Sequence, residues 1–380
     1  MAAEPRPPPD FERTTRIFAR ALGWSPDELL ARFRPAGEAD LEALLAFRDR
    51  TGWDDEAYVR WRYGIGHGHE HAYGRLWIVR HEDGPVVAAI GTEVQPIRHA
   101  GVVHAGQLLM DVQLDPALEG AGGGAWLNQA MFGHADATLA VGGNTHSMGL
   151  VRRLFAPLPP RSHHVLPLDA AAVLRRRGTP AMLAAVVGPA MDVGWRIRNR
   201  VLASRSPRDI RVQEVASVSA EWLEPLYAAL SPATACVAPG AAQLQWRLRD
   251  NPRAAYRLYI AMDGERCVGY LAARQTPVGV DGETGMHLID WKLADGDAEA
   301  VLAALLSHVV PLARRQGCSK VFTTCLAPAA EGALERCGFL RGQPGAHLLT
   351  GIRTTTGLPT DARTPHWQIT DLSFDSDGGY

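Results

Sequence analysis

A glycine-rich run over residues 119–125 is the part of the sequence best suited to hold a charged ligand. It reads Glu-Gly-Ala-Gly-Gly-Gly-Ala and follows an apolar segment that ends at Leu114. Glycine tolerates positive φ angles and lets a ligand approach the backbone closely. A turn that opens a helix also offers unpaired N–H groups and the positive end of the helix dipole, which suits a pyrophosphate. We expect such a turn at Gly120, Ala121, Gly122, Gly123, Gly124 and Ala125, preceded by strand residues Val112, Gln113 and Leu114; a plain flexible turn is the alternative.

Two carboxylates near this run are candidates for proton transfer. Asp111 lies near the end of the apolar segment, and Glu93 lies on a strand expected over residues 86–94. A positioned carboxylate can take a proton from a nucleophile, directly or through water. A structural role for Asp111, bonded to the backbone at a strand bulge, is the alternative. Tyr63 is a candidate proton donor.

The chain contains an internal repeat that fills it. Three anchor pairs (Trp61 and Trp246, Asp111 and Asp290, Phe155 and Phe339) are offset by 185, 179 and 184 residues in a chain of 380. Each copy reads as a helix, a meander of strands, and then strand–helix–strand–helix. We expect an α/β (α+β) fold of two domains, each a mixed, mostly antiparallel sheet flanked by helices. Expected elements are a helix over 38–51, strands over 76–80, 86–94 and 102–113, and a helix over 298–316.

The repeat predicts three parts: an N-terminal extension (residues 1–34), a first domain (35–200) and a second domain (201–380). The second copy lacks the glycine run. After Asp290 comes a segment with Asp295 and Asp297, acids that stand where phosphates would lie. We expect only the first copy to bind the phosphate ligand and the second to brace it and complete a cleft; a purely structural second copy is the alternative.

The glycine run and its surroundings resemble the central motif of the GNAT superfamily of N-acyltransferases. That motif is a strand, then Arg or Gln, two residues, Gly, one residue, and Gly or Ala, opening a helix. Gly122 and Gly124 match its glycines, but Glu119 replaces the Arg or Gln. The segment from Asn144 to Phe155 is similar to the family's Asn-x-x-Ala segment and following helix, with Val151 near the usual tyrosine. The likeness spans most of residues 35–375, and only the glycine run is a specific motif.

The resemblance implies an acyl-CoA-dependent N-acyltransferase that moves an acetyl or longer acyl group to a small-molecule or lipid amine. The glycine turn and Asn144 would hold CoA, and a backbone N–H near Val112 or Gln113 would polarise the thioester. Candidates for the base, or for contact with acceptor and thiolate, are Asp111, Glu93, His146 and, from the second copy, Asp290; Tyr63 is the candidate substrate contact. A lone loop histidine is more often without function.

Three alternatives stay open beside this reading. They are long-chain acylation of a lipid amine, a carrier-dependent transferase of the Fem type, and a non-catalytic tandem protein that binds a ligand. Glu119 and the missing tyrosine favour the last.

Composition limits the partners. The formal charge is −2 with acids and bases interspersed, so we expect no nucleic acid partner. The N-terminus carries no apolar signal segment, which favours the cytoplasm, and the sequence leaves the oligomeric state open. Five cysteines form no C-x-x-C pair and are expected to be unreactive. No metal is expected: His67, His69 and His71 alternate without a distant partner ligand, and Asp371, Asp375 and Asp377 are expected to be solvated.

An apolar stretch over residues 181–195 lies between two arginine groups, 175–177 and 196–200. It is too short to cross a bilayer. The pattern favours an amphipathic helix that links the two copies over a helix that lies on a membrane surface.

Overall fold

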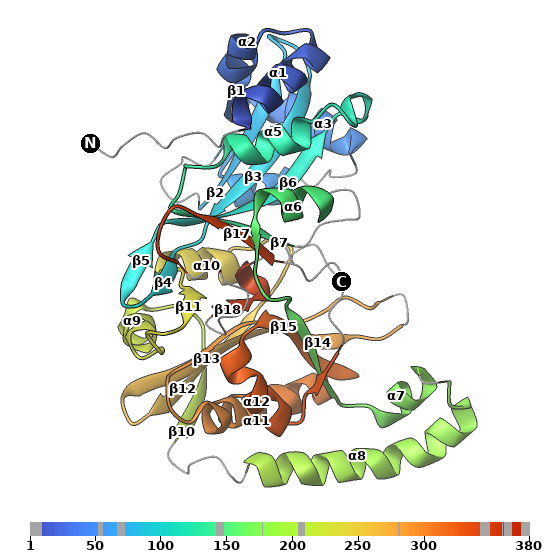
Figure 1. The fold of residues 1–380 in the computed structure, drawn as a ribbon. Coiled ribbons are helices and arrows are strands. Elements are labelled where there is room, and N and C mark those ends of the chain that lie inside the picture. The colour runs from blue at the N-terminus through green and yellow to red at the C-terminus, as the bar shows by residue number, and fades with distance from the viewer. Residues whose placement is uncertain are drawn as a thin grey trace. The chain divides into compact units, whose positions relative to one another are not determined.

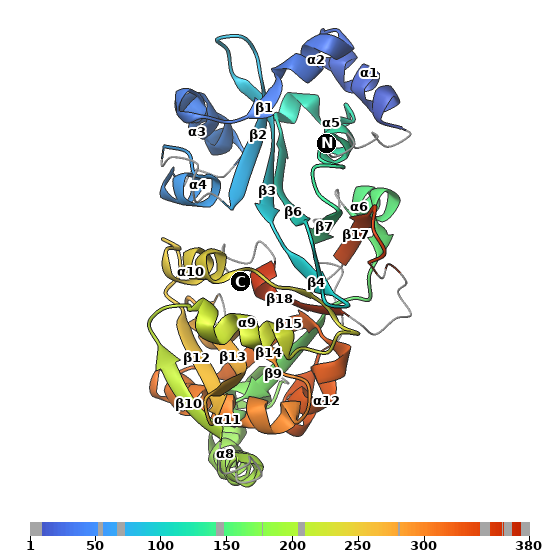
Figure 2. The same cartoon turned by 90° about the vertical axis from the view of Figure 1, so that its left-hand side faces the viewer.

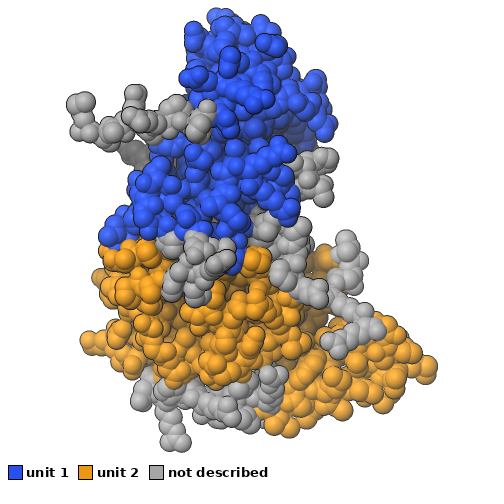
Figure 3. Space-filling view, in the orientation of Figure 1, with its two compact units in different colours: residues 1–97, 102–159, 346–364 blue, residues 98–101, 160–345, 365–380 orange. Residues whose placement is uncertain are grey.

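The computed structural model (Figure 1) describes residues 10–51, 56–66, 73–141, 148–176, 178–203, 210–279, 282–342, 350–358, 360 and 367–373. The chain forms two compact units (Figure 3). Unit 1 comprises residues 1–97, 102–159 and 346–364, and unit 2 comprises 98–101, 160–345 and 365–380. Each unit is a mixed sheet flanked by helices, which confirms the predicted fold class.

The sheet of unit 1 has the order β1–β2–β3–β6–β7–β17–β8, and all neighbours are antiparallel except β6 and β7. Helices α3 and α4 cover one face, and α5 and α6 cover the other (Figure 2). The strands are β1 (Phe33–Pro35), β2 (Gly74–Arg80), β3 (Val86–Val94), β6 (Gly106–Leu114), β7 (Ala137–Val141), β8 (Ala156–Pro157) and β17 (Thr350–Thr354). The helices are α1 (Phe11–Leu22), α2 (Pro26–Arg32), α3 (Leu41–Arg50), α4 (Glu56–Tyr63), α5 (Gly123–Ala130) and α6 (Met148–Leu154).

The prediction of a single strand over residues 102–113 is wrong, because this segment forms two strands. The chain forms β5 (Val102–His104), which pairs with β4 (Ile97–His99), and then β6 begins at Gly106. Between them the backbone N–H of Ala105 donates to the Asp136 carboxylate at 3.0 Å instead of to a strand. A side chain at Gly106 would place its Cβ 2.1 Å from the Gln95 carbonyl oxygen, so the residue that restarts the strand must be glycine.

The sheet of unit 2 repeats this order as β10–β12–β13–β14–β15–β9–β16, and β14 and β15 are its parallel pair. A further strand, β18, pairs with β15 and with β11. The strands are β9 (Ser162–Pro167), β10 (Ile210–Val215), β11 (Ala235–Val237), β12 (Arg257–Asp263), β13 (Arg266–Gln275), β14 (Gly285–Leu293), β15 (Lys320–Leu326), β16 (Leu340–Arg341) and β18 (Trp367–Thr370). The helices are α7 (Ala170–Arg176), α8 (Ala181–Ala203), α9 (Ala220–Ala228), α10 (Ala241–Arg249), α11 (Ala298–Arg315) and α12 (Pro328–Arg336).

Each sheet contains one strand from the other half of the chain. In unit 1, β17 lies between β7 and β8 and pairs with both. In unit 2, β9 takes the same place between β15 and β16. Neither half of the sequence therefore supplies every strand of its own sheet. The predicted domain boundary between residues 200 and 201 therefore stays a prediction about where the duplication divides the sequence. It does not describe the two compact units.

Residues 10–35 do not form a separate extension, because they belong to the core of unit 1. Strand β1 pairs with β2, and α1 packs on α5. Trp126 of α5 is fully buried and donates its indole N–H to Thr15 at 2.9 Å. The rings of Phe11, Phe18 and Phe33 surround this tryptophan. Such aromatic packing contributes more than its buried area alone, so α1 is needed to hold α5.

His164 makes the stability of unit 2 sensitive to pH. It lies in β9, is fully buried, and burial together with the charges of Arg341 and His163 lowers the pKa of its imidazole to about 4. The unfolded chain takes up this proton near pH 6.5, so the unfolded state binds more protons between pH 6.5 and 4. We expect the free energy of unfolding to fall by on the order of 2 kcal/mol as the pH drops through that window. Urea unfolding of wild type and His164→Leu across the window checks this, and a wild type that shows the same pH slope as the variant would refute it.

Candidate functional site

The sheet of unit 1 opens where β6 leaves β7. Their parallel pairing runs from Gly106 opposite Ala137 to Leu109 opposite Ala140, and β6 continues to Leu114 paired with β3 but not with β7. At the same point β6 is bulged against β3: the register jumps between Gly91, opposite Met110, and Ala89, opposite Gln113. A bulge bends its strand and increases the local twist. The two parallel strands therefore separate, and the backbone of β6 beyond Leu109 has no described strand on the β7 side.

Asp111 lies in the bulge with φ +48°, a left-handed conformation that a non-glycine residue seldom adopts. The next residue, Val112, has its side chain 40% exposed, whereas Gln113 is buried and its amide oxygen accepts a hydrogen bond from Thr51. Val112 is thus the point at which this strand faces solvent.

The glycine run forms a turn into α5, as predicted. Gly120 and Gly122 have φ +79° and +78°, and Gly122 is the N-cap of α5 with no described side chain bonded to the helix start. Gly123 is needed for packing, because a Cβ there would lie 2.6 Å from the ring of Phe18. Gly124 has room, its nearest neighbour being Leu150 at 3.7 Å. The first N–H groups of α5 are therefore left for another acceptor.

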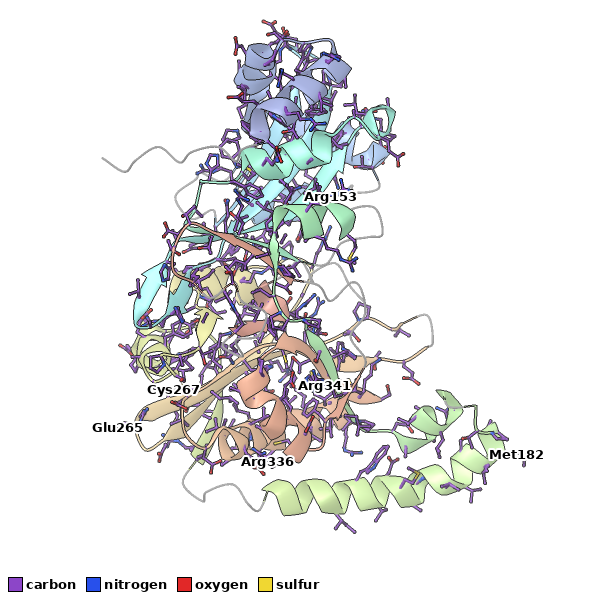
Figure 4. The ribbon with its side chains drawn as sticks, in the orientation of Figure 1. Arg153, Met182, Glu265, Cys267, Arg336 and Arg341 are labelled. Carbon is purple, nitrogen blue, oxygen red and sulfur yellow. The ribbon has the colours of Figure 1, made fainter. Side chains whose placement is uncertain are left out.

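The residue that departs from the resemblance, Glu119, is exposed. Of the neighbouring residues of the turn, Ala121 and Ala125 are half-buried. Arg152 and Arg153 are exposed on α6, which packs against α5 (Figure 4 labels Arg153). Exposed cations thus lie on the helix that packs against α5.

The structure brings Asp111 and Tyr63 together. The Tyr63 hydroxyl, at the end of α4, donates to Asp111 Oδ2. Arg48 of α3 reaches the same oxygen at 3.5 Å, and all three side chains are buried. A Cβ at Gly91 would lie 2.4 Å from the Tyr63 oxygen, so the glycine of β3 makes room for this contact.

Glu93 lies in an adjoining buried ion pair with Arg62 of α4, at 2.8 Å. Gln95 donates to the other carboxylate oxygen at 2.8 Å, and Arg62 also contacts the Met110 sulfur at 3.0 Å. Two arginines thus balance two carboxylates beneath the bulge. Buried ions need such partners, because an unpaired one carries a large desolvation cost. Sequence reasoning missed Arg48 and Arg62; the Trp-Arg pair that recurs at Trp246 and Arg247 is a signal that could have found Arg62.

Asn144, His146 and the histidines of residues 67–71 lie outside the described residues, and their proposed roles stay predictions. Within the part of the chain that the structure describes, no three His, Cys, Asp or Glu side chains gather as metal ligands would.

In unit 2, Asp290 occupies the place of Asp111 but is fully bonded within that unit. Its oxygens accept from Tyr270 and Thr370, both at 2.5 Å, from Lys292 at 2.8 Å and from the backbone N–H of Trp291 at 2.9 Å. It is 1% exposed. This environment favours a structural role for Asp290, and its reach toward the cleft of Asp111 stays a prediction.

The gap between the parallel strands of unit 2 is occupied. Pairing of β14 with β15 ends at His287 opposite Phe322, and β18 then pairs with the far part of β15. Trp367 of β18 is buried, and Gln368 donates to the Trp291 carbonyl at 3.3 Å. A pocket of about 140 Å³ remains beside Trp367 and the start of α11, smaller than the ~300 Å³ or more typical of ligand sites.

In unit 2 the N-terminus of α11 also has a hydrogen-bond acceptor from the same unit. Asp297 is the N-cap of α11 and accepts from the N–H of Ala300 at 3.1 Å. A carboxylate thus stands where unit 1 has Gly122.

The expectation that Asp371 is solvated is wrong. Asp371 is fully buried after β18, where Arg161 at 2.6 Å and His287 at 2.7 Å contact its two oxygens. Burial alone would raise the pKa of this carboxyl, but the hydrogen bond from His287 and the charges of His287 and Arg161 lower it. From the sequence alone the segment around Asp371 looks like a solvated polar tail, because its partners His287 and Arg161 lie 84 and 210 residues away along the chain. Asp375 and Asp377 lie outside the described residues.

All five cysteines are buried. Burial raises the pKa of the Cys267 thiol to about 11 and that of Cys337 to about 12. A thiol with so high a pKa is a poor nucleophile, because the thiolate is the reactive form.

No protein-family model and no curated protein matches the sequence. Solved structures do. A protein of unknown function from Enterococcus faecalis, described as a probable N-acyltransferase, is 10% identical and aligns with a TM-score of 0.53 over 85% of this chain and 72% of its own. A GCN5-related N-acetyltransferase from Anabaena variabilis is 14% identical, with a TM-score of 0.50 over 77% of this chain and 66% of its own. The chain therefore has the GNAT-type N-acyltransferase fold, with its element order present twice.

Proposed function

We propose that the protein is an acyl-CoA-dependent N-acyltransferase whose donor site lies in unit 1. The observation that carries the proposal is the opening between β6 and β7, followed along the chain by a glycine turn whose helix start no described side chain caps. An extended thioester fits such an opening, and the turn suits the pyrophosphate of CoA. The backbone of β6 beside Val112 would then supply the N–H that polarises the thioester carbonyl.

Unit 2 is proposed to have a supporting role. Its strand opening holds β18, and its helix start is capped by Asp297. Both features occupy positions that a CoA molecule would need. We therefore expect one donor site per chain.

The amine acceptor and the acyl length are open within this proposal. Transfer requires a proton to leave the attacking amine and a proton to reach the thiolate. The pair of Tyr63 and Asp111 beneath the bulge is the proposed route for one of them, since the two groups share a hydrogen bond next to Val112.

Calorimetric titration of the full chain with CoA, acetyl-CoA and a long-chain acyl-CoA tests the donor. Saturable binding at one site per chain supports the proposal, and the preferred chain length separates small-amine from lipid-amine acylation. Absence of binding to all three, with a cooperative thermal transition retained, would replace it with a carrier-dependent transferase or a non-catalytic protein.

If Tyr63 lies on the proton route, the variant Tyr63→Phe should lose turnover while it keeps its affinity for CoA. We expect thiol release from acyl-CoA, measured against a panel of small amines, to fall by about 10²-fold or more, because a positioned acid–base group contributes that much. Affinity for CoA should stay within about threefold, since Tyr63 lies beneath the strand rather than at the turn.

Tyr270→Phe is the matched control, because the hydroxyl of Tyr270, from β13, likewise donates to the aspartate of its own unit, Asp290. It removes the same hydroxyl and should leave turnover unchanged. Equal loss in both variants would mean that the hydroxyls act only through stability.

A further inference from the structure

Helix α8 presents an apolar face that nothing described in unit 2 covers. It is 23 residues long, about 35 Å, and packs against α7 and α11. In Figure 1 the pair α7–α8 projects from the edge of unit 2, and Figure 4 labels Met182 near the start of α8. Met182, Val186, Val193 and Ile197 are 86, 76, 52 and 57% exposed.

The spacing places these side chains on one stripe. Steps of four, four, three and four residues along a helix return to the same side, so residues 182, 186, 190, 193 and 197 share a face. Ala184 and Gly188, on the opposite side, are buried. A Cβ at Gly188 would lie 2.7 Å from that of Ala171, which shows how closely α8 approaches α7. The exposed stripe is therefore held outward by a tight contact on the other face.

Asp192, the acidic residue of α8, does not lie on the exposed stripe. Asp192 accepts the backbone N–H of Ala170 at 2.9 Å, which fixes α8 to the start of α7. The exposed stripe thus carries aliphatic side chains and no group that makes a directional hydrogen bond.

The formal charge of this segment is opposite in sign to that of the rest of the chain. Residues 170–203 contain six arginines, at 175–177, 196, 198 and 200, and one acid, Asp192, a formal charge of +5. Since the whole chain carries −2, all other residues together carry −7. Basic residues that flank an apolar helical stripe are the pattern of helices that lie in the interface of anionic bilayers.

We propose that α8 docks the protein on the surface of an anionic phospholipid bilayer. The stripe of Met182, Val186, Val193 and Ile197 enters the headgroup boundary, and the formal charge of +5 that the sequence gives residues 170–203 attracts this segment to anionic lipid. A protein partner is less well matched, because the stripe offers no polar group for specific recognition, whereas a fluid apolar layer needs none. No helix in the described part of the chain has the length and apolar character to span a bilayer, so α8 would lie along the surface.

Co-sedimentation of the full chain with vesicles tests this inference independently of CoA binding. We expect binding to vesicles of phosphatidylcholine mixed with phosphatidylglycerol, little binding to phosphatidylcholine alone, and weaker binding as salt is raised. Val186→Glu should lower the vesicle-bound fraction at least tenfold, since it places a carboxylate in the stripe.

Val278→Glu is the matched control, because Val278 is 66% exposed in the segment between β13 and β14 and lies outside α8. It should bind vesicles as wild type does. Equal loss in both variants, or no wild-type binding to anionic vesicles, would overturn the proposal. So would a chain that is dimeric in size-exclusion chromatography, becomes monomeric on Val186→Glu and ignores vesicles, because the stripe would then be a contact between two copies.

Discussion

Gly124→Asp is expected to lower the affinity of the protein for CoA by at least tenfold while leaving its fold intact. Gly124 is the second residue of α5, and a Cβ there meets only Leu150, at 3.7 Å. A carboxylate in the first turn of a helix interacts favourably with the helix dipole, so stability should be unchanged or slightly raised. The same carboxylate would stand about 4 Å from a bound phosphate, where repulsion costs about 1–4 kcal/mol.

This variant separates a phosphate site from a plain turn. A bulkier change at Gly123 would not, because it would collide with Phe18 and disturb packing. Gly240→Asp is the matched control, since Gly240 is the N-cap of α10, has open space around it and takes the same added charge. Calorimetry on both variants should show loss only at Gly124. Wild-type affinity in Gly124→Asp would remove the pyrophosphate from this turn, even if CoA binds elsewhere.

The repeat and the glycine turn could be read from the sequence because both are local patterns. Periodic apolar residues predict helices and strands, and glycines followed by a helical pattern predict a turn into a helix start. Asp111, Glu93 and Tyr63 were found for the same reason, since each lies on or beside such an element. Their grouping in one buried network follows from the pairing of β3 with β6 and from the packing of α4.

The pairing of strands that lie far apart in the sequence could not be predicted from local patterns. The exchange of β9 and β17 between the sheets joins residues such as Val141 and Thr350, and no local pattern records which sheet a strand enters. Arg48 was missed because a single arginine in an amphipathic helix predicts exposure, whereas the folded chain buries it against Asp111. Asp371 was misread in the same way, since an acid in a polar tail is ordinarily solvated.

Asp371→Asn is expected to destabilise the protein by about 3–5 kcal/mol, because it leaves the buried Arg161 without its counter-charge. The amide has one acceptor oxygen, whereas Asp371 accepts at both oxygens, from Arg161 at 2.6 Å and from His287 at 2.7 Å. One of these donors would face an NH2 group. Urea unfolding of the full chain measures the loss, and Asp263→Asn, at an exposed strand end, is the matched control that should change stability by less than about 0.5 kcal/mol.

The pH dependence follows from the lowered pKa of Asp371. The unfolded chain takes up this proton near pH 4, before the folded protein does, so the stabilisation is present above that pH and is lost as the pH falls through the folded value. Asp371→Asn should therefore remove part of the acid sensitivity of wild type below about pH 4. Because Asp371 follows β18 directly, the same anchor holds Trp367 and Gln368 in the strand opening of unit 2. If this variant unfolds like wild type at every pH, the buried anchor contributes no stability, and another contact must keep that opening closed.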